Sequence, residues 1–431
     1  MRLGGRASAA IEVLQDMDAR RRPVADALKD WGLSHRFAGS GDRAAIGNIV
    51  YDVLRRRRSL GWRMGDETPT SLVCGALLDA GREPTALADE FAGDRHAPAM
   101  PAQEAVDRFV SADLEWASPA VRADVPDWLA EPLSRSLGAD WIDEVRALGA
   151  RPPLDMRVNA LKADRQTVEA ALAPFGATPT SIAPLGLRIA PIEGEGRHPN
   201  VQVEGAFQTG QFEIQDEGSQ IAAALCDAQP GERVLDYCAG AGGKTLALAA
   251  RMAGEGELHA FDADRQRLAP IWERLARAGA TNVTVHAPRE DLSELESAMD
   301  RVIVDAPCTG SGTWRRRPDA KWRLSASQLE RRMKEQDAVL DAASVYVRPG
   351  GRLFYITCSL LADENVDRIE AFLGRRSGFR VLDAADLFGK RFPQAGEPYR
   401  ATEIGDGSVL TLTPLRTGTD GFFIAALERD A

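Results

Sequence analysis

The sequence predicts an α/β protein whose largest part is a doubly wound parallel sheet with a terminal antiparallel hairpin, preceded by an all-α region and a small α+β region. From about residue 205 onward, short apolar runs alternate with helical patterns, as in parallel sheets that are covered on both faces. Residues 1–142 instead carry apolar residues at helical spacing. The chain has 431 residues, more than one ordinary core holds, so several domains are expected.

The first region, residues 1–142, is predicted to be a small helical bundle. Ile46, Val50 and Leu54 recur at helical spacing, so one face of their helix is apolar. Asp42 stands at the start of this pattern, where an acidic residue can cap a helix. The run of arginines that follows would lie at the carboxyl end, where positive charge is favoured.

The second region, residues 143–204, is predicted to be a compact α+β domain. A role of this domain in RNA binding is implied only by the family resemblance described below. Prolines and glycines separate short strand-like pieces, LDMRVNAL and LGLRIAP, around one helical segment, DRQTVEAALAPFG. This region has no catalytic motif of its own.

The third region, residues 205–431, carries the alternating pattern. Its helices are expected to begin at Lys244, to cover 265–278 and to follow Ser325. The expected strands are 233–237, 257–261, 282–286, 301–305 and 352–356, and the expected hairpin pairs 409–414 with 422–427. Ligands of a doubly wound sheet bind outside the carboxyl ends of its strands, so a functional site is expected there.

Cysteine usage and apolar content limit the cellular context. The chain has five cysteines, an odd number, with no CxxC pair and no close group of cysteine and histidine. This argues against a disulfide framework or a metal site, and favours a reducing, cytoplasmic compartment. The apolar stretches are shorter than the roughly 20 residues that cross a bilayer, and the first residues lack a signal-peptide core, so no membrane partner is expected.

The net charge of −11 is unusual for a protein that binds nucleic acid, which normally leaves a basic footprint. Basic residues nevertheless gather in two places, 55–63 and 315–323. In the second place Trp314 and Trp322 are interleaved with the basic residues and could stack on bases. A solvated helix face is the alternative interpretation of such a charge run.

A glycine-rich loop, DYCAGAGGKT at residues 236–245, follows the first expected strand of the sheet, where its glycines let the backbone approach a ligand at a helix amino terminus. The loop does not fit the phosphate-binding loop of nucleotide triphosphatases, because Cys238 takes the place of the first glycine. It does not fit the dinucleotide fingerprint either, because Thr245 takes the place of the third glycine. A nucleoside without a pyrophosphate fits better, with Asp262 at the end of the second strand holding ribose hydroxyls. A tight turn beside a surface acid is the alternative.

Two cysteines follow expected strands at the edge of the sheet where a ligand would lie. Cys308 stands in DAPCTGSG, just after the strand that ends at Asp305, and Cys358 stands in TCS after the last parallel strand. A cysteine in such a place can act as a nucleophile, since part of a thiol is ionised at neutral pH. A small buried residue is the alternative, as expected of Cys74 and Cys226 in their apolar helical context.

The chain carries, in this order, DYCAGAGGKT, FDADRQRL, DAPCTGSGTWRRRPDAKWR and YITCSLLADEN. These motifs resemble those of the RsmB/Sun family of RNA cytosine-5 methyltransferases. The resemblance covers about residues 143–431, because LDMRVNAL and FQTGQFEIQDEGSQ resemble the RNA-binding extension of that family. Residues 1–142, with GDRAAIGNIVYDVLRRR, more distantly resemble a NusB-like domain. The paired Pro-Cys and Thr-Cys contexts are highly specific, whereas the glycine loop alone is not.

The resemblance implies a class I methyltransferase fold, S-adenosylmethionine as cofactor and RNA as partner. It implies that Cys358 adds to position 6 of a cytosine and that Cys308 assists release. Asp305 would contact position 3 of the base or the cofactor, and Lys244 would lie near both thiols. The implied cofactor-binding residues are Cys238, Ala239, Gly240, Ala241, Gly242, Gly243, Lys244, Asp262 and Asp305. The candidate RNA-binding residues are Arg315, Arg316, Arg317, Lys321, Trp322 and Arg323.

Two places depart from the family pattern. Ala241 stands where the family usually has a proline, a change that the backbone tolerates. Where the family commonly has an acid that holds the adenine, this chain has Arg289, with Glu290 and Asp291 just beyond, so that contact stays unassigned.

The resemblance favours 16S ribosomal RNA as the substrate, with transfer RNA as the alternative. A DNA cytosine-5 methylase, in which Cys308 would be the nucleophile, and a non-catalytic RNA-binding factor are the other candidates. A monomer is expected, because the chain has two accessory domains and no heptad pattern.

Overall fold

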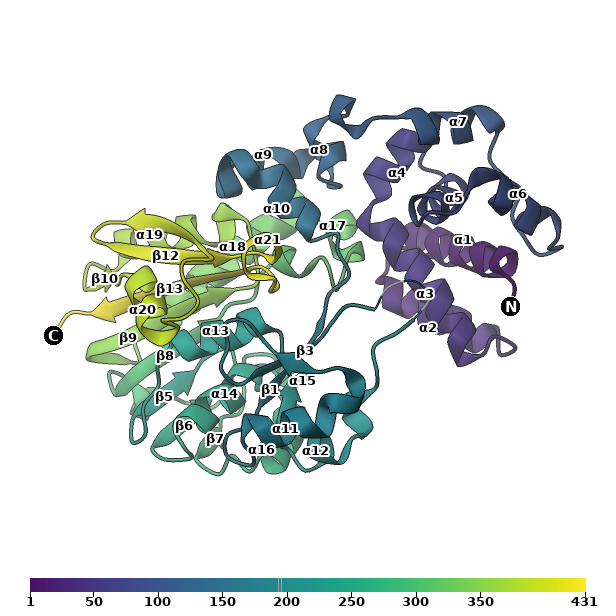
Figure 1. Ribbon diagram of the computed structural model, residues 1–431. Helices are drawn as coiled ribbons and strands as arrows, with labels where there is room; N and C mark the ends of the chain where they lie inside the picture. Colours follow the sequence, from purple (N-terminus) through teal and green to yellow (C-terminus); the bar gives the residue numbers. More distant parts are fainter. Residues whose placement is uncertain (193, 195) are drawn as a thin grey trace. The chain divides into compact units, whose positions relative to one another are not determined.

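The computed structural model describes residues 1–192, 194 and 196–431, and the chain divides into two compact units (Figure 1). Unit 1 consists of residues 1–151, the described part of 192–197, and 313–324. Unit 2 consists of residues 152–191, 198–312 and 325–431. The segment 313–324 therefore belongs by its contacts to unit 1, although in the sequence it lies within the predicted sheet region.

Unit 1 is helical, as predicted for the first part of the chain, and its helices pack around an apolar core. Its longer helices are α1 (Leu3–Arg20), α2 (Val24–Ser34), α3 (Ser40–Arg55), α4 (Arg57–Met64), α5 (Pro69–Asp79), α6 (Pro84–Ala92) and α7 (Gln103–Ser111). Shorter ones follow: α8 (Pro119–Arg122), α9 (Ala130–Leu137), α10 (Trp141–Ala147) and, from the distant segment, α17 (Asp319–Arg323).

Helix α3 confirms the apolar stripe that the sequence predicts, with Val50 and Leu54 both 0% exposed. The predicted cap at Asp42 is wrong, because α3 begins before this residue and Asp42 lies inside the first turn. There its carboxylate pairs with the terminal amine of Met1 at 2.9 Å and with Arg6 at 3.0 Å. Asp42 therefore ties α1 to α3 instead of ending the helix.

The first basic cluster, 55–63, is neutralised within unit 1. Each of its arginines pairs with a carboxylate: Arg55 with Asp52, Arg56 and Arg63 with Asp79, Arg57 with Asp18, and Arg58 with Asp127. Partly buried ion pairs of this kind hold helices together, and they leave less positive charge for a phosphate than the sequence suggests.

The second basic cluster packs against the carboxyl end of α3. Lys321 Nζ donates to the carbonyl of Arg55 at 2.9 Å, and Trp322 Nε1 donates to the carbonyl of Leu54 at 2.7 Å. These bonds satisfy carbonyls that the end of a helix leaves without an intrahelical partner. Lys321 is only 4% exposed.

The predicted RNA contacts of Lys321 and Arg315 are therefore not supported, because burial leaves these side chains no surface for RNA. The same holds for stacking by Trp314, which is 1% exposed. Arg317 is exposed, and Arg316, Trp322 and Arg323 are partly exposed, so RNA contacts by these four stay predictions.

The burial of Lys321 predicts an unusual dependence of stability on pH. Burial lowers the pKa of Lys321 to about 8, against the opposing effect of Asp124. The folded protein thus releases a proton near pH 8 that the unfolded chain keeps until about pH 10.4, so the free energy of unfolding rises as the pH increases through this window. Relative to Lys321→Met, we expect the wild type to gain up to about 3 kcal/mol between pH 7.5 and pH 10 in urea denaturation.

Lys29→Met, at an exposed lysine of the same unit, is the matched control and should show no such trend. A difference between wild type and Lys321→Met that stays constant or shrinks as the pH rises would contradict this account of Lys321.

Unit 2 contains a small antiparallel sheet with the strand order β2-β3-β1-β4. Its strands are β1 (Leu154–Val158), β2 (Thr178–Pro179), β3 (Gly186–Ile189) and β4 (Phe212–Ile214), and helix α11 (Arg165–Leu172) packs on it through Val168 and Leu172. Strand β4 pairs with β1 and lies beyond residue 204, the predicted end of the α+β region. The small sheet therefore includes part of the segment that the sequence assigns to the next region.

A buried glutamate of β4 joins the small sheet to the larger part of unit 2. Glu213, 3% exposed, pairs with Arg274 at 2.9 Å and with Arg277 at 2.5 Å, both on helix α16 (Ile271–Ala278). Asn159 adds hydrogen bonds to the carbonyls of Gly210 and Ala278, each at 2.8 Å. Such charge-assisted contacts fix the small sheet against the helices beside the glycine loop.

The large sheet has the strand order β11-β12-β13-β9-β8-β5-β6-β7, with β10 paired to β13. Its strands are β5 (Arg233–Asp236), β6 (Glu257–Ala260), β7 (Val283–Val285), β8 (Met299–Asp305), β9 (Val347–Thr357), β10 (Phe379–Val381), β11 (Arg400–Ile404), β12 (Gly407–Leu412) and β13 (Phe422–Arg429). The pairings among β5 to β9 are parallel, and those of β10 to β13 are antiparallel. This confirms the predicted doubly wound sheet with an antiparallel end, although β13 lies directly against β9 and not at the outer edge.

The middles of the central strands are apolar on both sides because both faces of the sheet are covered. In β8, Ile303 points into one apolar cluster, whereas Val302 and Val304 point into the other. Helices α13 (Glu217–Leu225), α14 (Gly243–Arg251), α16 and α20 (Ala384–Arg391) contribute to the first cluster, and α18 (Ala326–Ser344) and α19 (Val366–Arg375) to the second. Period-two alternation disappears from such strands, as in other doubly wound sheets.

The helix predicted over 265–278 is broken into α15 (Arg265–Leu268) and α16. Pro270 lies at the break, because proline has no backbone N–H to donate and restricts the preceding residue. The other short helices of unit 2 are α12 (Gly205–Gln208) and α21 (Pro414–Thr417), which lies between the two strands of the terminal hairpin.

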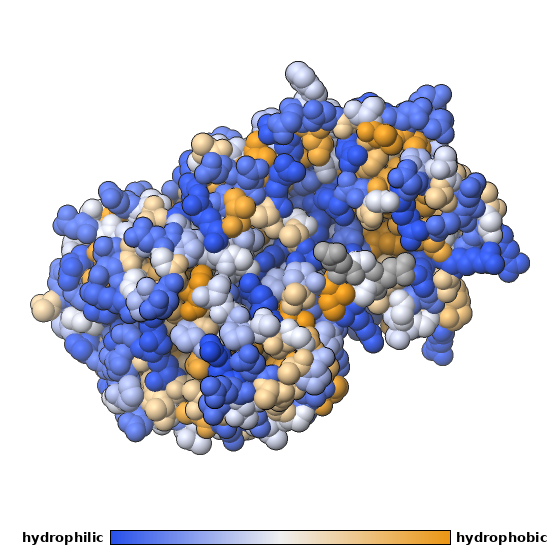
Figure 2. All heavy atoms as spheres, viewed as in Figure 1, coloured by the Kyte–Doolittle hydropathy of each residue, from blue (hydrophilic) through white to orange (hydrophobic). Residues whose placement is uncertain are grey.

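On the face shown in Figure 2, hydrophilic side chains predominate and hydrophobic ones appear as scattered patches. Exposed large apolar residues such as Trp116, Phe37 and Trp272 come from separate helices or loops. Within the described part of the chain, no helix is both long and apolar enough to span a bilayer.

Candidate active site

The predicted site residues meet at one edge of the large sheet. Strands β5, β6, β8 and β9 are parallel neighbours, so their carboxyl ends lie along the same edge. Cys238, Asp262, Asp305 and Cys358 follow these strands in that order, and each of them lines one cavity of about 1050 Å³. Cys308 lines the same cavity. The topology thus unites residues from four separate motifs.

The two cysteines lie in direct contact. The Sγ atoms of Cys308 and Cys358 are 3.4 Å apart, and neither forms a disulfide. The hydrogen bond to Cys358 and burial raise the pKa of Cys308 well above its ordinary value. Cys308 is therefore a neutral thiol at neutral pH, whereas Cys74 and Cys226 are buried away from this cavity, as their apolar context predicts.

A buried lysine forms an ion pair at the site. Lys244 Nζ is 2.7 Å from Asp305 Oδ2, and the lysine is only 6% exposed. Burial works to lower the pKa of Lys244, but the charge and hydrogen bond of Asp305, together with the charge of Cys358, raise it above its ordinary value. Lys244 is therefore a cation at neutral pH, and its place near both thiols stays a prediction.

The glycine loop has the backbone of a ligand-binding turn. Gly240 and Gly242 have φ angles of 50° and 81°, which residues with a side chain rarely adopt. A Cβ at Gly242 would lie 2.7 Å from Ile271 Cγ1, so the turn is also closed to larger residues by packing. Gly240 N donates to Asp262 Oδ2 at 2.9 Å, which brings the acid of the second strand beside the turn.

The remaining residues predicted to bind the cofactor lie around this turn. Ala239 and Gly242 close it through a backbone hydrogen bond of 2.8 Å, and Gly243 begins α14. The carbonyl of Ala241 accepts a hydrogen bond from Arg274 at 2.7 Å, which holds the position where the family usually has proline. These residues form the turn but are not part of the described cavity lining, whereas Cys238 lines the cavity.

Asp236, at the end of β5, carries a buried acceptor that the described residues do not satisfy. Thr245 donates to its Oδ2 at 2.7 Å, but its Oδ1 has no hydrogen-bond partner within the described chain. Burial raises the pKa of Asp236 to about 7. Asp236 is 0% exposed and is not part of the described lining of the cavity, so it supports the glycine turn from below. Asp262 does line the cavity beside the turn, where it would hold ribose hydroxyls, and the residues of this edge therefore fit S-adenosylmethionine.

Several lining residues were not found from the sequence. Tyr237 directly precedes Cys238 and Phe261 directly precedes Asp262, so the sequence positions of both residues could have predicted that they line the cavity. Arg332, Glu335 and Val339 come from α18, which carries no recognisable motif. Only packing of this helix on the sheet brings them to the cavity.

The third strand end does not supply a lining acid in the described structure. Glu290 accepts a hydrogen bond from the backbone N–H of Ala287 at 2.8 Å and contacts His286 Nδ1 at 2.7 Å. Arg289 is exposed, and the cavity lining that the structure describes includes neither residue.

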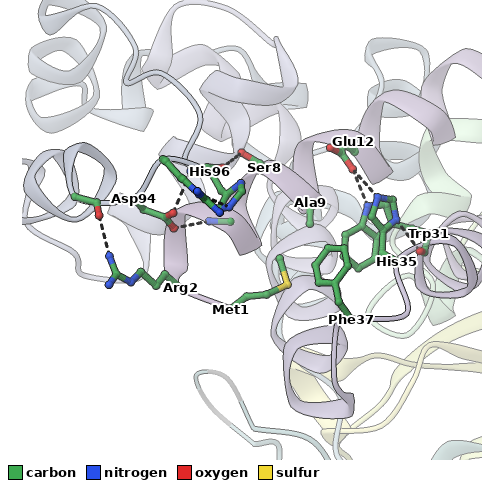
Figure 3. A pocket seen from close by; sticks show the side chains of 13 residues that line it. Met1, Arg2, Ser8, Ala9, Glu12, Trp31, His35, Phe37, Asp94 and His96 are labelled. Carbon is green, nitrogen blue, oxygen red and sulfur yellow. Dashed lines mark hydrogen bonds and ion pairs between the residues drawn. The ribbon is translucent and has the colours of Figure 1, made fainter.

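Unit 1 has a cavity of its own, of about 880 Å³ (Figure 3). The ring of Trp31 stacks on that of His35 at 4.3 Å between centroids, and Trp31 Nε1 donates to Glu12 at 2.7 Å. The residues described around it include none of the predicted site residues, so this cavity is not the predicted site.

Comparison with known proteins gives the family of the chain. Residues 223–428 match the 16S rRNA methyltransferase RsmB/F family, and residues 125–191 match the ferredoxin-like domain of RsmF/B-like methyltransferases. The probable ribosomal RNA small subunit methyltransferase B of Synechocystis sp. is 32% identical over 323 residues, which cover 74% of this chain and 69% of that protein. The ribosomal RNA small subunit methyltransferase B of Pseudomonas syringae pv. tomato is 33% identical and covers 73% of this chain and 67% of that protein.

Solved structures show the same relationship. The crystal structure of PH0851 is 25% identical, with a TM-score of 0.72 over 100% of both chains. A methyltransferase homolog from Pyrococcus horikoshii is 27% identical, with a TM-score of 0.57, over 72% of this chain and 97% of that one. The predicted family and cofactor are thus confirmed: the chain belongs to the RsmB/F family of S-adenosylmethionine-dependent methyltransferases.

Proposed function

We propose that this protein methylates carbon 5 of a cytosine in RNA, with 16S ribosomal RNA as the favoured substrate, through a covalent bond between Cys358 and carbon 6 of the base. The observation that carries the proposal is the contact of two thiols, 3.4 Å apart, in a cavity that also contains Asp305. The RNA part rests on relatives that are named as methyltransferases of small-subunit ribosomal RNA.

The chemistry explains why a thiol is needed. Carbon 5 of cytosine is a poor nucleophile, but a thiolate that adds to carbon 6 converts the ring into an enamine whose carbon 5 can attack an electrophile. S-adenosylmethionine supplies an electrophilic methyl group when it is bound. Cys358 performs the addition, and the charge of Lys244 interacts with it.

Asp305 and Cys308 support the two halves of the reaction. Asp305 lines the cavity and is held by Lys244, so its carboxylate can face position 3 of the cytosine during the addition. The proton on carbon 5 must then pass to a base, and the bond between Cys358 and carbon 6 breaks as the ring double bond re-forms. Cys308, next to Cys358, serves as that base after it has lost its own proton to solvent, and as a neutral thiol in the free protein it does not compete for the first attack.

The base has to reach the thiols outside a stacked helix, so the target cytosine is expected to be unpaired or flipped out. Arg316, Arg317 and Arg323 are the candidate contacts with the RNA backbone. A cytoplasmic location and a monomeric state belong to the same proposal.

Cys308→Ser tests the assignment of the two cysteines. We expect this variant to form a covalent protein–RNA adduct that survives denaturing electrophoresis, because Cys358 still adds to the base but its release is blocked. The matched control is the double variant Cys308→Ser/Cys358→Ser, which should form no adduct. An adduct that forms with Cys308 present and Cys358 replaced would instead favour the chemistry of a DNA cytosine-5 methylase.

The substrate is identified by bisulfite sequencing of total RNA from a strain that lacks this protein. We expect one cytosine of 16S ribosomal RNA to lose its protection from conversion. Loss of protection in a transfer RNA would replace the ribosomal substrate with the alternative.

A further inference from the structure

A buried carboxylate lies behind the two thiols. Glu364 is 0% exposed and ends the short 3-10 helix η8 (Ala362–Glu364), which precedes α19. No cation lies within ion-pair distance of it among the residues that the structure describes. A buried carboxylate is costly unless hydrogen bonds compensate it, so its partners indicate what it is for.

All four side-chain hydrogen bonds of Glu364 hold the surroundings of the cysteines. Oε1 accepts from the backbone N–H of Thr309 at 2.8 Å and from Gln336 Nε2 at 2.9 Å. Oε2 accepts from the hydroxyls of Thr309 and Ser359. Thr309 directly follows Cys308 in the chain, and Ser359 directly follows Cys358, so one carboxylate binds both cysteine loops.

The charges around the two sulfurs are arranged unequally. Two of the four hydrogen bonds of Glu364 come from Thr309, and a third comes from Gln336, which also donates to the carbonyl of Pro307 at 2.9 Å; only one comes from Ser359. The carboxylate therefore binds mainly the loop of Cys308, and its charge acts on that thiol, whereas Lys244 interacts with the charge of Cys358. A negative neighbour disfavours a thiolate, and a positive neighbour favours it.

We infer that Glu364 is a positioning residue that binds both cysteine loops and whose negative charge keeps Cys308 a neutral thiol, which leaves Cys358 to attack the base. The inference rests on the proposed function. It explains why Cys358 attacks the base and Cys308 assists the release. In this arrangement Cys358 gives its proton to water, and the thiol of Cys308 donates a hydrogen bond to the thiolate 3.4 Å away.

The hydrogen-bond pattern allows the charge to be removed without breaking the contacts. In Glu364→Gln the remaining oxygen can accept from the two N–H donors at Oε1. The new amide group then lies where Oε2 was, facing the hydroxyls of Thr309 and Ser359, which can rotate to accept. This variant therefore separates the charge of Glu364 from its shape.

The test is the pH dependence of alkylation in the full chain, with iodoacetamide at less than one equivalent and peptide mass spectrometry to read each cysteine. In the wild type we expect Cys358 to be labelled first and Cys308 only at higher pH. In Glu364→Gln we expect the midpoint for Cys308 to fall by about one pH unit, a roughly tenfold gain in its labelling relative to Cys358 at pH 7.5. Glu330→Gln, at an exposed glutamate of α18, is the matched control, and buried Cys226 is the unlabelled reference.

Thr309→Val distinguishes charge from packing, because it removes a hydrogen bond and keeps the carboxylate. We expect its labelling ratio to match the wild type, and a shift as large as that of Glu364→Gln would overturn the inference. If Glu364→Gln does not fold, Gln336→Lys supplies the neutralising charge from the other side. An unchanged midpoint for Cys308 in whichever variant folds also overturns the inference.

Alkylation needs neither RNA nor cofactor, so this result is independent of the proposed reaction. With RNA present, Glu364→Gln should lower kcat and leave KM for RNA unchanged, because the charge acts on the thiols and not on RNA binding. A protein that shows the labelling shift but methylates no cytosine would refute the proposed function and leave the role of Glu364 standing.

Discussion

Cys358→Ser is expected to lose methyl transfer by at least about 10³-fold, because a serine hydroxyl is ionised far less than a thiol and is a much weaker nucleophile toward carbon 6. The loss should appear in kcat, since the side chain acts on the reacting atoms and contributes little to binding of the rest of the RNA. The replacement removes one sulfur from a cavity wall, so unfolding should change little. The measurement is incorporation of labelled methyl groups into unmodified RNA under single-turnover conditions.

Two comparisons complete this experiment. Cys74→Ala, at a buried cysteine of unit 1, should retain activity. Calorimetry should show that Cys358→Ser still binds S-adenosylmethionine, which separates lost chemistry from a lost fold. Retention of more than about a tenth of the wild-type rate would mean that the covalent step does not pass through Cys358.

Lys244→Met is expected to lower kcat by about 10²- to 10³-fold at neutral pH, because it removes the cation that favours the thiolate of Cys358 and holds Asp305. Lys244 is 6% exposed, and it forms an ion pair with Asp305 at 2.7 Å. Methionine keeps the length and apolar stem of the side chain, so the effect is mainly one of charge.

The pH dependence separates this effect from misfolding. Removal of a cation near a thiol disfavours the thiolate, so the activity of Lys244→Met should recover in part as the pH rises from 7 to 9. The control is Lys390→Met, whose side chain is 72% exposed, and it should follow the wild-type profile. A rate that is equally low at every pH would show that Lys244 acts through structure or base orientation and not through the thiolate.

The large sheet and most of its functional edge were predictable because the signals are local. The strand predicted over 301–305 is the end of β8, and the strand predicted over 352–356 lies within β9. Cys308 and Cys358 are 50 positions apart in the sequence, yet they meet because neighbouring parallel strands end at the same edge. The position of a residue just after such a strand in the sequence therefore also predicts that it lies at this edge of the sheet.

Other contributors to the site carry no local signal. Glu364 looks like an ordinary acid near a helix start, and its role becomes visible only when four donors from three segments converge on it. Arg332 and Val339 occupy an amphipathic helix whose pattern predicts burial of one face but not which cavity that face reaches. The break of the helix at Pro270 was visible in the sequence and was missed.

By itself, the sequence determined the order of strands and helices, the parallel sheet and the edge at which the thiols, the acids and the glycine turn gather. Those features follow from apolar periodicity, turn residues and the handedness of βαβ connections, all of which act over a few dozen residues at most. Tertiary structure alone decided that Lys321 and Trp322 satisfy the carbonyls of α3, and that Glu364 binds both cysteine loops. A polar side chain is exposed or buried according to the partners that the rest of the chain brings to it, and that balance between desolvation and hydrogen bonding is not written in its neighbours along the sequence.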